Sequence, residues 1–249
     1  MNIINEEKFS DMRWKMYFIE GNKGKNSDIY KMENTVVKMF YNPKDMTEQL
    51  LDKYDILSKL ESNRFVMLKD IICIDNKVVG ITMPYIDNNI TSIDNINMYL
   101  LLNELKIIKK DIISFTKKRI AIRDCHSFNL IFNDKLNIID TDDYIPLSNC
   151  PKFFETLPLR EKSYNLYNLN LYQINTGIIY FLSKNLSNRF TSSDKTKFNL
   201  SLYNGLKELN GQYYTYIGEY LERDISKNES IEEYAKRKIK QTTNTIYFL

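Results

Sequence analysis

Arg123-Asp124-Cys125-His126-Ser127-Phe128-Asn129, followed shortly by Ile138-Ile139-Asp140-Thr141-Asp142-Asp143, is the part of the sequence that decides the fold. The residues between the two segments predict a hairpin, which would bring Asp124, Asn129 and Asp140 together. Carboxylate and amide oxygens are the ligands that magnesium prefers. A carboxylate that is not needed by the metal can orient or deprotonate an attacking hydroxyl group. The alternative is that these are ordinary turn residues, because Asp and Asn favour turns through local hydrogen bonds.

Two further polar features lie upstream of this stretch. The loop Gly21-Asn22-Lys23-Gly24-Lys25-Asn26-Ser27-Asp28-Ile29 contains small residues that let backbone N–H groups approach phosphate oxygens. Taken alone, this loop is explained more simply as a hairpin turn. Lys38 lies among apolar residues on an expected strand, where a fixed cation could hold phosphates. The alternative for Lys38 is an edge-strand lysine whose amine reaches solvent.

The apolar pattern divides the chain into two expected lobes. Residues 1–84 predict a small antiparallel sheet with one helix, and residues 85–249 predict a larger helical lobe. A hinge is expected near Pro84–Asp87. The strands of the first lobe are expected at Met16–Glu20, Ile29–Met32, Val36–Phe40, Phe65–Ile74 and Lys77–Met83, with Pro43 ending the first hairpin and a helix over Thr47–Leu60. The second lobe is expected to contain a long helix over Asn97–Phe115, hairpin strands near Leu130–Phe132 and Leu136–Ile139, and helices from about Tyr164 onward.

In order and spacing, these features resemble the protein-kinase-like superfamily, which includes protein kinases and small-molecule kinases such as aminoglycoside phosphotransferases. Asn22-x-Gly24-x-x-Ser27-x-Ile29 resembles its Gly-rich loop, and Val36-Val37-Lys38 resembles its phosphate-binding lysine strand. Arg123-Asp124 through Asn129 resembles its catalytic loop, and Asp140 resembles the first residue of its metal-binding motif. The resemblance covers about residues 16 to 143 and implies an α+β, bilobal, protein-kinase-like fold.

The resemblance also implies ATP and Mg²⁺ as cofactors and a role for each matching residue. Lys38 would hold the α- and β-phosphates, and Asp124 would be the catalytic base. His126 would approach the γ-phosphate, with a structural histidine as the alternative. Magnesium would be held by Asn129 and Asp140, with Asp142 as an alternative ligand. The nucleotide would also be contacted by Asn22, Gly24, Ser27, Ile29, Met83, Tyr85 and Ile86.

Some positions depart from the pattern of this superfamily. Thr141 and Asp142 replace the Phe and Gly that usually follow the metal-binding Asp. Lys53 falls where a helix glutamate normally pairs with the phosphate-binding lysine, which leaves Glu48 and Asp52 as candidates for that acid. These departures keep open the alternative of a pseudokinase that binds nucleotide as a regulatory module.

The expected function is that of an ATP-dependent phosphotransferase acting on a protein Ser/Thr hydroxyl or on itself. The short distance in sequence between Lys38 and Asp124 leaves no room for the large hinge insert that is common in small-molecule kinases. Asp124-x-His126 and the run Asp140-Thr141-Asp142 favour the opposite interpretation, a small-molecule kinase of the aminoglycoside phosphotransferase type.

Charge and composition indicate which partners to expect. The net charge is +3, from 35 basic and 32 acidic side chains. Because the two signs are nearly balanced, nucleic acid is not expected as a partner. The densest basic run, Lys236-Arg237-Lys238-x-Lys240, is expected to be the solvated face of a helix. No apolar run is long enough to span a membrane, and the first residues lack a signal peptide's apolar centre, so a cytoplasmic protein is expected. The three cysteines form no CxxC pair.

Overall fold

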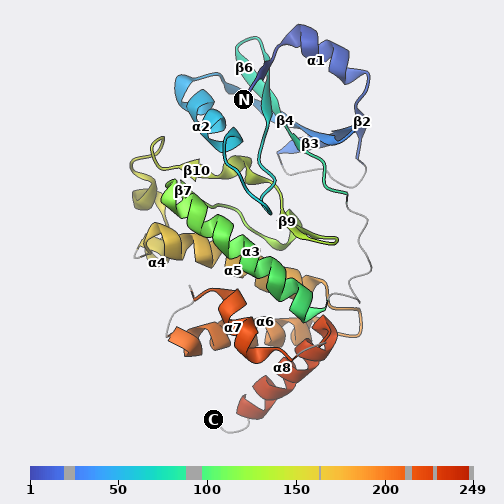
Figure 1. Ribbon diagram of the computed structural model, residues 1–249, viewed down its shortest axis with the longest axis vertical. Helices are drawn as coiled ribbons and strands as arrows, with labels where there is room; N and C mark the ends of the chain where they lie inside the picture. Colours follow the sequence, from blue (N-terminus) through green and yellow to red (C-terminus); the bar gives the residue numbers. More distant parts are fainter. Residues whose placement is uncertain (20–25, 88–96, 163, 211–214, 227–228, 247–249) are drawn as a thin grey trace.

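Figure 1 shows the computed structural model, which describes residues 1–249 apart from 20–25, 88–96, 163, 211–214, 227–228 and 247–249. The chain is an α+β protein with a sheet-rich N-terminal part and a helical C-terminal part, as the sequence predicts. In the described part of the chain, no helix combines the length and the apolar character that crossing a membrane requires.

The N-terminal part is built on a six-stranded sheet with the strand order β1-β5-β6-β4-β3-β2. Its strands are antiparallel to their neighbours, except that β1 runs parallel to β5. The strands are β1 (Ile3–Ile4), β2 (Tyr17–Phe18), β3 (Ser27–Met32), β4 (Thr35–Asp45), β5 (Asp70–Ile74) and β6 (Lys77–Pro84). Two helices accompany the sheet, namely α1 (Glu6–Arg13) and α2 (Glu48–Ser58).

The strand pattern differs from the expectation in three places. Pro43 does not end the first hairpin, because β4 continues through it and its pairing with β6 becomes irregular around that residue. Proline is tolerated at such an irregularity because no ladder hydrogen bond is needed from it. The strand expected from Phe65 begins only at Asp70, and Phe65 instead forms a single parallel bridge with Ile138. β1 and α1 were not expected.

The C-terminal part is centred on two long helices, α3 (Met98–Lys117) and α5 (Leu166–Lys184) (Figure 1). The other helices are α4 (Leu159–Lys162), α6 (Ser192–Asn210), α7 (Ile217–Asp224) and α8 (Ile231–Ile246). Between α3 and α5 lie two short antiparallel pairs, β7 (Ile120–Ala121) with β10 (Ile145–Pro146) and β8 (Leu130–Phe132) with β9 (Leu136–Ile138). The second pair is the expected hairpin.

One hydrophobic core runs through both parts of the molecule. It contains fully buried side chains from α2, α3 and α5, such as Leu57, Ile108 and Ile178. At the junction, the ring of Phe65 lies 4.9 Å from the ring of Phe115 on α3, measured between centroids. Burying each such side chain stabilises the fold by about 1.5–3 kcal/mol. The shared core therefore fixes the sheet relative to the helices, and the candidate site lies at this junction.

The basic run on α8 is only partly a solvated face. Lys236 and Lys240 are exposed, as expected. Arg237 instead donates hydrogen bonds to Glu229, at 2.9 and 3.0 Å. Lys238 is 8% exposed and donates to the hydroxyl of Tyr220 at 2.6 Å. Half of this run therefore holds α8 against its neighbours.

Candidate functional site

The loop that contains Asp124 rests directly on α5. Asn170, which is buried in α5, accepts a hydrogen bond from the backbone N–H of Ile122 at 2.8 Å and donates one to the backbone oxygen of Ile120 at 3.0 Å. Gly177 lies further along the same helix, where an added Cβ would be only 2.6 Å from Sγ of Cys125. These contacts fix the backbone of the loop and so the direction of its side chains.

Asn129 joins this loop to the segment that carries Asp140. Its Nδ2 donates a hydrogen bond to the backbone oxygen of Asp124 at 2.9 Å, and its own backbone oxygen accepts one from the N–H of Ile139 at 2.9 Å. Only 6% of Asn129 is exposed. Among the described residues, no hydrogen-bond donor reaches Oδ1 of Asn129. This oxygen can therefore bind a cation without breaking an existing bond.

Asp140 and Asp142 are presented by a tight turn after β9. Asp140 has a left-handed backbone conformation with a φ of 61°, and Thr141–Asp143 then forms a short 3-10 turn. A non-glycine residue in that conformation costs roughly 1–3 kcal/mol and needs support from its surroundings. Thr141 supplies such support, because it is fully buried and its hydroxyl donates to the backbone oxygen of Val66 at 2.8 Å.

Lys38 on β4 is the cation that meets these two carboxylates. Its Nζ donates hydrogen bonds to Oδ1 of Asp140 and, at 2.9 Å, to Oδ1 of Asp142. Burial alone would lower the pKa of Lys38, but the attraction of Asp142 and Asp140 outweighs it and the pKa is raised. Burial alone would raise the pKa of Asp142, but Lys38 lowers it below its ordinary value. Both partners of this buried pair are therefore charged at neutral pH.

Helix α2 supplies no acid to Lys38. Glu48 and Asp52, the two candidates from the sequence, are exposed and form no ion pair with Lys38. On α2, the half-buried Lys53 is the residue whose charge interacts with the cluster. Burial lowers the pKa of Lys53, and the attraction of Asp143 opposes this only in part. The expectation of a helix carboxylate is therefore wrong, and Asp140 and Asp142 take its place.

Asp124 and His126 lie on the exposed side of the loop. The side chain of Asp124 is 57% exposed, and its Oδ2 lies 3.7 Å from Nε2 of His126. Nδ1 of His126 accepts a hydrogen bond from the backbone N–H of Phe128 at 3.2 Å. This bond assigns the ring proton to Nε2, the atom that faces Asp124. The carboxylate of Asp124 is thus free to meet a hydroxyl group from outside.

The residues expected to contact a nucleotide are only partly described. Asn22 and Gly24 lie outside the described residues. Ser27 is buried on β3, and Ile29 on the same strand is the register partner of Lys38. Ile29, an expected nucleotide contact, and Lys38, the expected phosphate contact, are therefore neighbours on adjacent strands.

The expected hinge residues continue from the end of β6. Met83 is 6% exposed and packs within the main core. Tyr85 and Ile86 are half-buried, and Nζ of Lys31 lies 3.7 Å from the ring centroid of Tyr85. The backbone N–H of Tyr85 donates to the backbone oxygen of Asn34 at 2.9 Å. Met83 thus supports the fold, whereas Tyr85 and Ile86 remain partly open.

The oxygen atoms of Asn129, Asp140 and Asp142 have the chemistry that magnesium requires. In the described part of the chain, no group of three His, Cys, Asp or Glu side chains is arranged to hold a metal ion. A magnesium site here would therefore combine the Asn129 amide with the aspartates. Lys38 is bonded to Oδ1 of both carboxylates, so their Oδ2 atoms are the oxygens that a divalent cation could bind without displacing the ammonium group.

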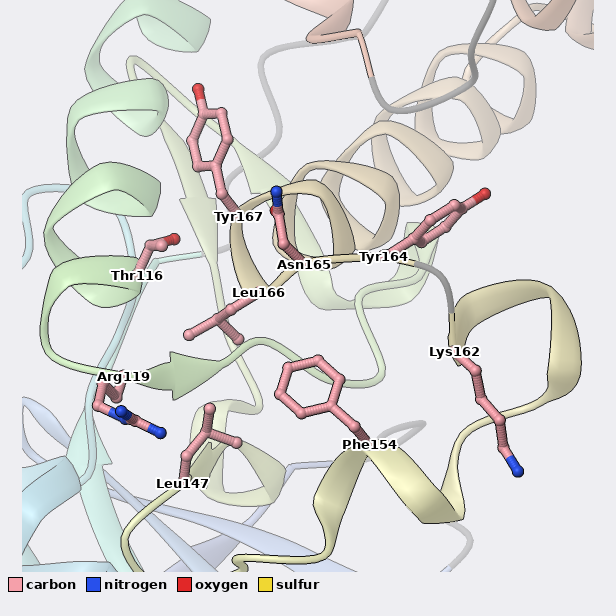
Figure 2. Close-up of a pocket in the computed structure, with 9 residues that line it drawn as sticks. All are labelled: Thr116, Arg119, Leu147, Phe154, Lys162, Tyr164, Asn165, Leu166 and Tyr167. Atoms are coloured by element: carbon pink, nitrogen blue, oxygen red, sulfur yellow. The ribbon is translucent and has the colours of Figure 1, made fainter.

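A separate pocket of about 610 Å³ lies between the end of α3 and the start of α5 (Figure 2). It is lined by Thr116, Arg119, Leu147, Phe154, Lys162, Tyr164, Asn165, Leu166 and Tyr167. None of the residues that the sequence proposes for the site belongs to this set. The pocket is therefore distinct from the cluster around Lys38.

The comparisons with known proteins find a distant likeness. No family model matches the chain. The chain is similar to a protein of Acanthamoeba polyphaga mimivirus whose name reads "Putative serine/threonine-protein kinase". The two are 26% identical over 138 residues, which are 51% of this chain and 50% of the viral protein. The chain thus spans about half the length of that curated relative, and the likeness loosely supports a relationship to kinases.

Proposed function

We propose that this protein is an ATP- and magnesium-dependent kinase with a protein-kinase-like fold, in which residues 1–84 form the N-lobe and residues 85–249 the C-lobe. The observation that carries the proposal is the meeting of Lys38 with Asp140 and Asp142, which are 102 and 104 residues away in sequence. The exposed carboxylate of Asp124 and the open amide oxygen of Asn129 lie on the adjoining loop. The named mimivirus relative supports the same class of activity.

In this proposal each residue of the cluster has its own role in binding. Lys38 holds the phosphates of ATP, and Asn129 and Asp140 hold magnesium. The metal supplies positive charge that offsets the charge on the transferred phosphoryl group. Asp142 keeps Lys38 in place, which is the role that a helix glutamate plays in related kinases. Lys38 therefore shifts part of its bonding from Asp140 to the phosphates when the nucleotide binds.

The chemical step is a transfer between two oxygen atoms. The hydroxyl oxygen of the acceptor forms a bond to the γ-phosphorus of ATP, and the bond from that phosphorus to the bridging oxygen of ADP breaks. The hydroxyl proton passes to the carboxylate of Asp124. The exposure of this carboxylate and its fixed loop support the assignment, because a base must reach the hydroxyl from the acceptor's side. The acceptor is proposed to be a Ser/Thr hydroxyl of a protein, or of the enzyme itself.

Incubation of the purified protein with Mg²⁺ and γ-labelled ATP tests the proposal. It should be carried out alone, with cell lysate and with a panel of hydroxyl-bearing small molecules, and the Asp124→Asn variant serves as control. Label on protein that depends on Asp124 is the expected result. Label on a small molecule alone would favour the aminoglycoside phosphotransferase type. Binding of ATP without any transfer would favour a pseudokinase, for which the absence of a helix acid beside Lys38 is the supporting observation.

A further inference from the structure

Phe128, in the loop beside the proposed base, exposes 71% of its surface. It directly precedes the buried Asn129, so the backbone that places the ring is fixed by the bonds of Asn129. An exposed aromatic ring adds nothing to the core, although burying it would stabilise the fold. Its position therefore suits a contact with a molecule that approaches Asp124.

Lys184, at the end of α5, covers part of this ring. Its Nζ lies 3.6 Å from the centroid of Phe128. On another side, the ring of His126 meets Phe128 edge to face, with centroids 5.9 Å apart. Since Nε2 of His126 lies 3.7 Å from Asp124, these side chains form one continuous surface that begins at the proposed base. We call His126, Phe128 and Lys184 the acceptor shelf.

The acceptor shelf is held by a rigid element. Gly177 of α5 is in close contact with Cys125, so the helix and the loop approach each other without an intervening side chain. Lys184 follows Gly177 by two helical turns and lies on the same face of α5. Packing therefore sets the distance between the loop and the backbone of Lys184.

Lys184 brings a positive charge that the protein does not neutralise. Among the described residues, no carboxylate forms an ion pair with its Nζ, and no hydrogen-bond acceptor is bonded to it. Partial burial lowers its pKa. At an exposed site the contact between Nζ and the ring is weak, and a charge-assisted hydrogen bond to a carboxylate is stronger. An anionic group would therefore bind Lys184 in preference to the ring alone.

We propose that the acceptor shelf selects a peptide segment that carries acidic side chains next to the phosphorylated Ser or Thr. A carboxylate of the peptide pairs with Lys184, an apolar part of the segment packs on the ring of Phe128, and the hydroxyl group reaches Asp124. A segment with basic flanking residues is repelled by Lys184. This inference rests on the proposed function, because it names the acceptor of that reaction.

Peptide binding tests the inference without requiring phosphate transfer. Three fluorescent peptides of equal length, each with one Ser flanked by Glu, Gln or Lys, are titrated with the full-length protein and followed by fluorescence anisotropy. We expect the Glu peptide to bind at least about threefold more tightly than the Gln peptide, and the Lys peptide to bind most weakly. Lys184→Glu should reverse this order. Phe128→Ala should weaken the binding of all three peptides.

The matched control is Lys240→Glu, which changes the net charge equally at an exposed site on α8. It should keep the wild-type order, and equal thermal stability of the variants shows that each is folded. Equal binding of the three peptides, or an unchanged order in Lys184→Glu, would overturn the inference. If the order reverses but no peptide is phosphorylated, the docking site stands and the proposed kinase activity fails. If peptides are phosphorylated without preference for acidic residues, the activity stands and the docking site fails.

Discussion

Nζ of Lys38 donates a hydrogen bond to Oδ1 of Asp142 at 2.9 Å, and Asp142 is the most deeply buried acid in contact with this lysine. The side chains of Lys38 and Asp142 are 11% and 3% exposed. Removing one partner of such a pair leaves the other charge buried without water or a counter-charge, which strongly destabilises the fold. The pair is therefore both a support of the fold and the starting arrangement of the proposed site.

Lys38→Met should destabilise the protein by about 3–5 kcal/mol at neutral pH, because Asp140 and Asp142 then face each other without a cation. Urea unfolding measures the loss. Lys44→Met is the matched control, since Lys44 lies further along β4 and donates to the hydroxyl of Tyr54 at 3.1 Å, not to a carboxylate. An equal loss in both variants would show that the ion pair is not the cause.

The cost of Lys38→Met should shrink as the pH falls from 7 to 4. In the wild type, Lys38 holds the pKa of Asp142 below its ordinary value of 3.8, so the contribution of Asp142 to stability persists above that value and is lost below it. Burial raises the pKa of Asp140 above its ordinary value even beside Lys38. Without Lys38, burial would raise the pKa of Asp140 further and would raise that of Asp142 as well. Protonation then relieves the variant more than the wild type. Thermal unfolding at several pH values would contradict this if the difference stayed constant.

Asp140→Asn and Asp142→Asn should have different effects. We expect Asp140→Asn to lower the apparent affinity for magnesium in the presence of ATP while the fold stays intact, since a metal ligand is seldom a support of the core. Asp142→Asn should mainly destabilise the fold and weaken ATP binding, because it releases Lys38. Calorimetric titration of Mg²⁺ and thermal unfolding separate the two. The assignment is reversed if Asp142→Asn shows the larger loss of magnesium affinity.

Lys53→Glu should destabilise the fold, although a glutamate is the residue that the kinase pattern favours at this position. Its carboxylate would lie near Asp142 and Asp143, which now attract Lys53. Lys53→Met should change the stability little, because burial already lowers the pKa of the ammonium group that it removes. Thermal unfolding of both variants checks this. A more stable Lys53→Glu protein would mean that the new acid reaches Lys38.

The arrangement of the site could be predicted where local sequence determines local structure. The hairpin between Asn129 and Asp140 follows from its apolar pattern and turn residues, and the structure confirms it. The partner of Lys38 could not be predicted, because it depends on how far α2 stands from β4. The alternation of Asp140 and Asp142 is the available signal in the sequence, but it indicates metal ligands as readily as partners of a lysine.

Contacts between residues far apart in the sequence could not be predicted either. Phe65 is a residue type that favours strands, and the sequence predicts a strand that begins there. In the structure it forms only a single bridge, with Ile138 in the other part of the chain. That contact depends on tertiary packing, which outweighs strand propensity. The acceptor shelf could not be predicted for the same reason, since Phe128 and Lys184 are brought together only by the packing of α5 on the loop.

Gly177→Ala should destabilise the protein, although alanine favours helices by about 1 kcal/mol over glycine. The added Cβ would lie 2.6 Å from Sγ and 3.0 Å from the backbone oxygen of Cys125. Relieving such overlap costs about 1–3 kcal/mol. Cys125→Ala in the same chain should recover part of the loss, because it removes the nearer atom. Thermal unfolding of the single and double variants measures this, and simple additivity of the two changes would contradict the assigned contact.

Asp124→Asn should separate binding from chemistry. The side chain of Asp124 is exposed and bonded to no phosphate-binding residue, and only its backbone oxygen contacts Asn129. The variant should therefore keep the fold and its affinity for ATP and Mg²⁺. It should lower phosphate transfer by about a hundred- to ten-thousandfold, the effect of losing a positioned base. Asp75→Asn, which removes an exposed acid from the turn between β5 and β6, is the control and should change neither quantity. ATP affinity and label transfer are measured on the same preparations. Transfer at the wild-type rate would remove Asp124 from the mechanism, whereas loss of ATP affinity together with transfer would make it a binding residue and not a base.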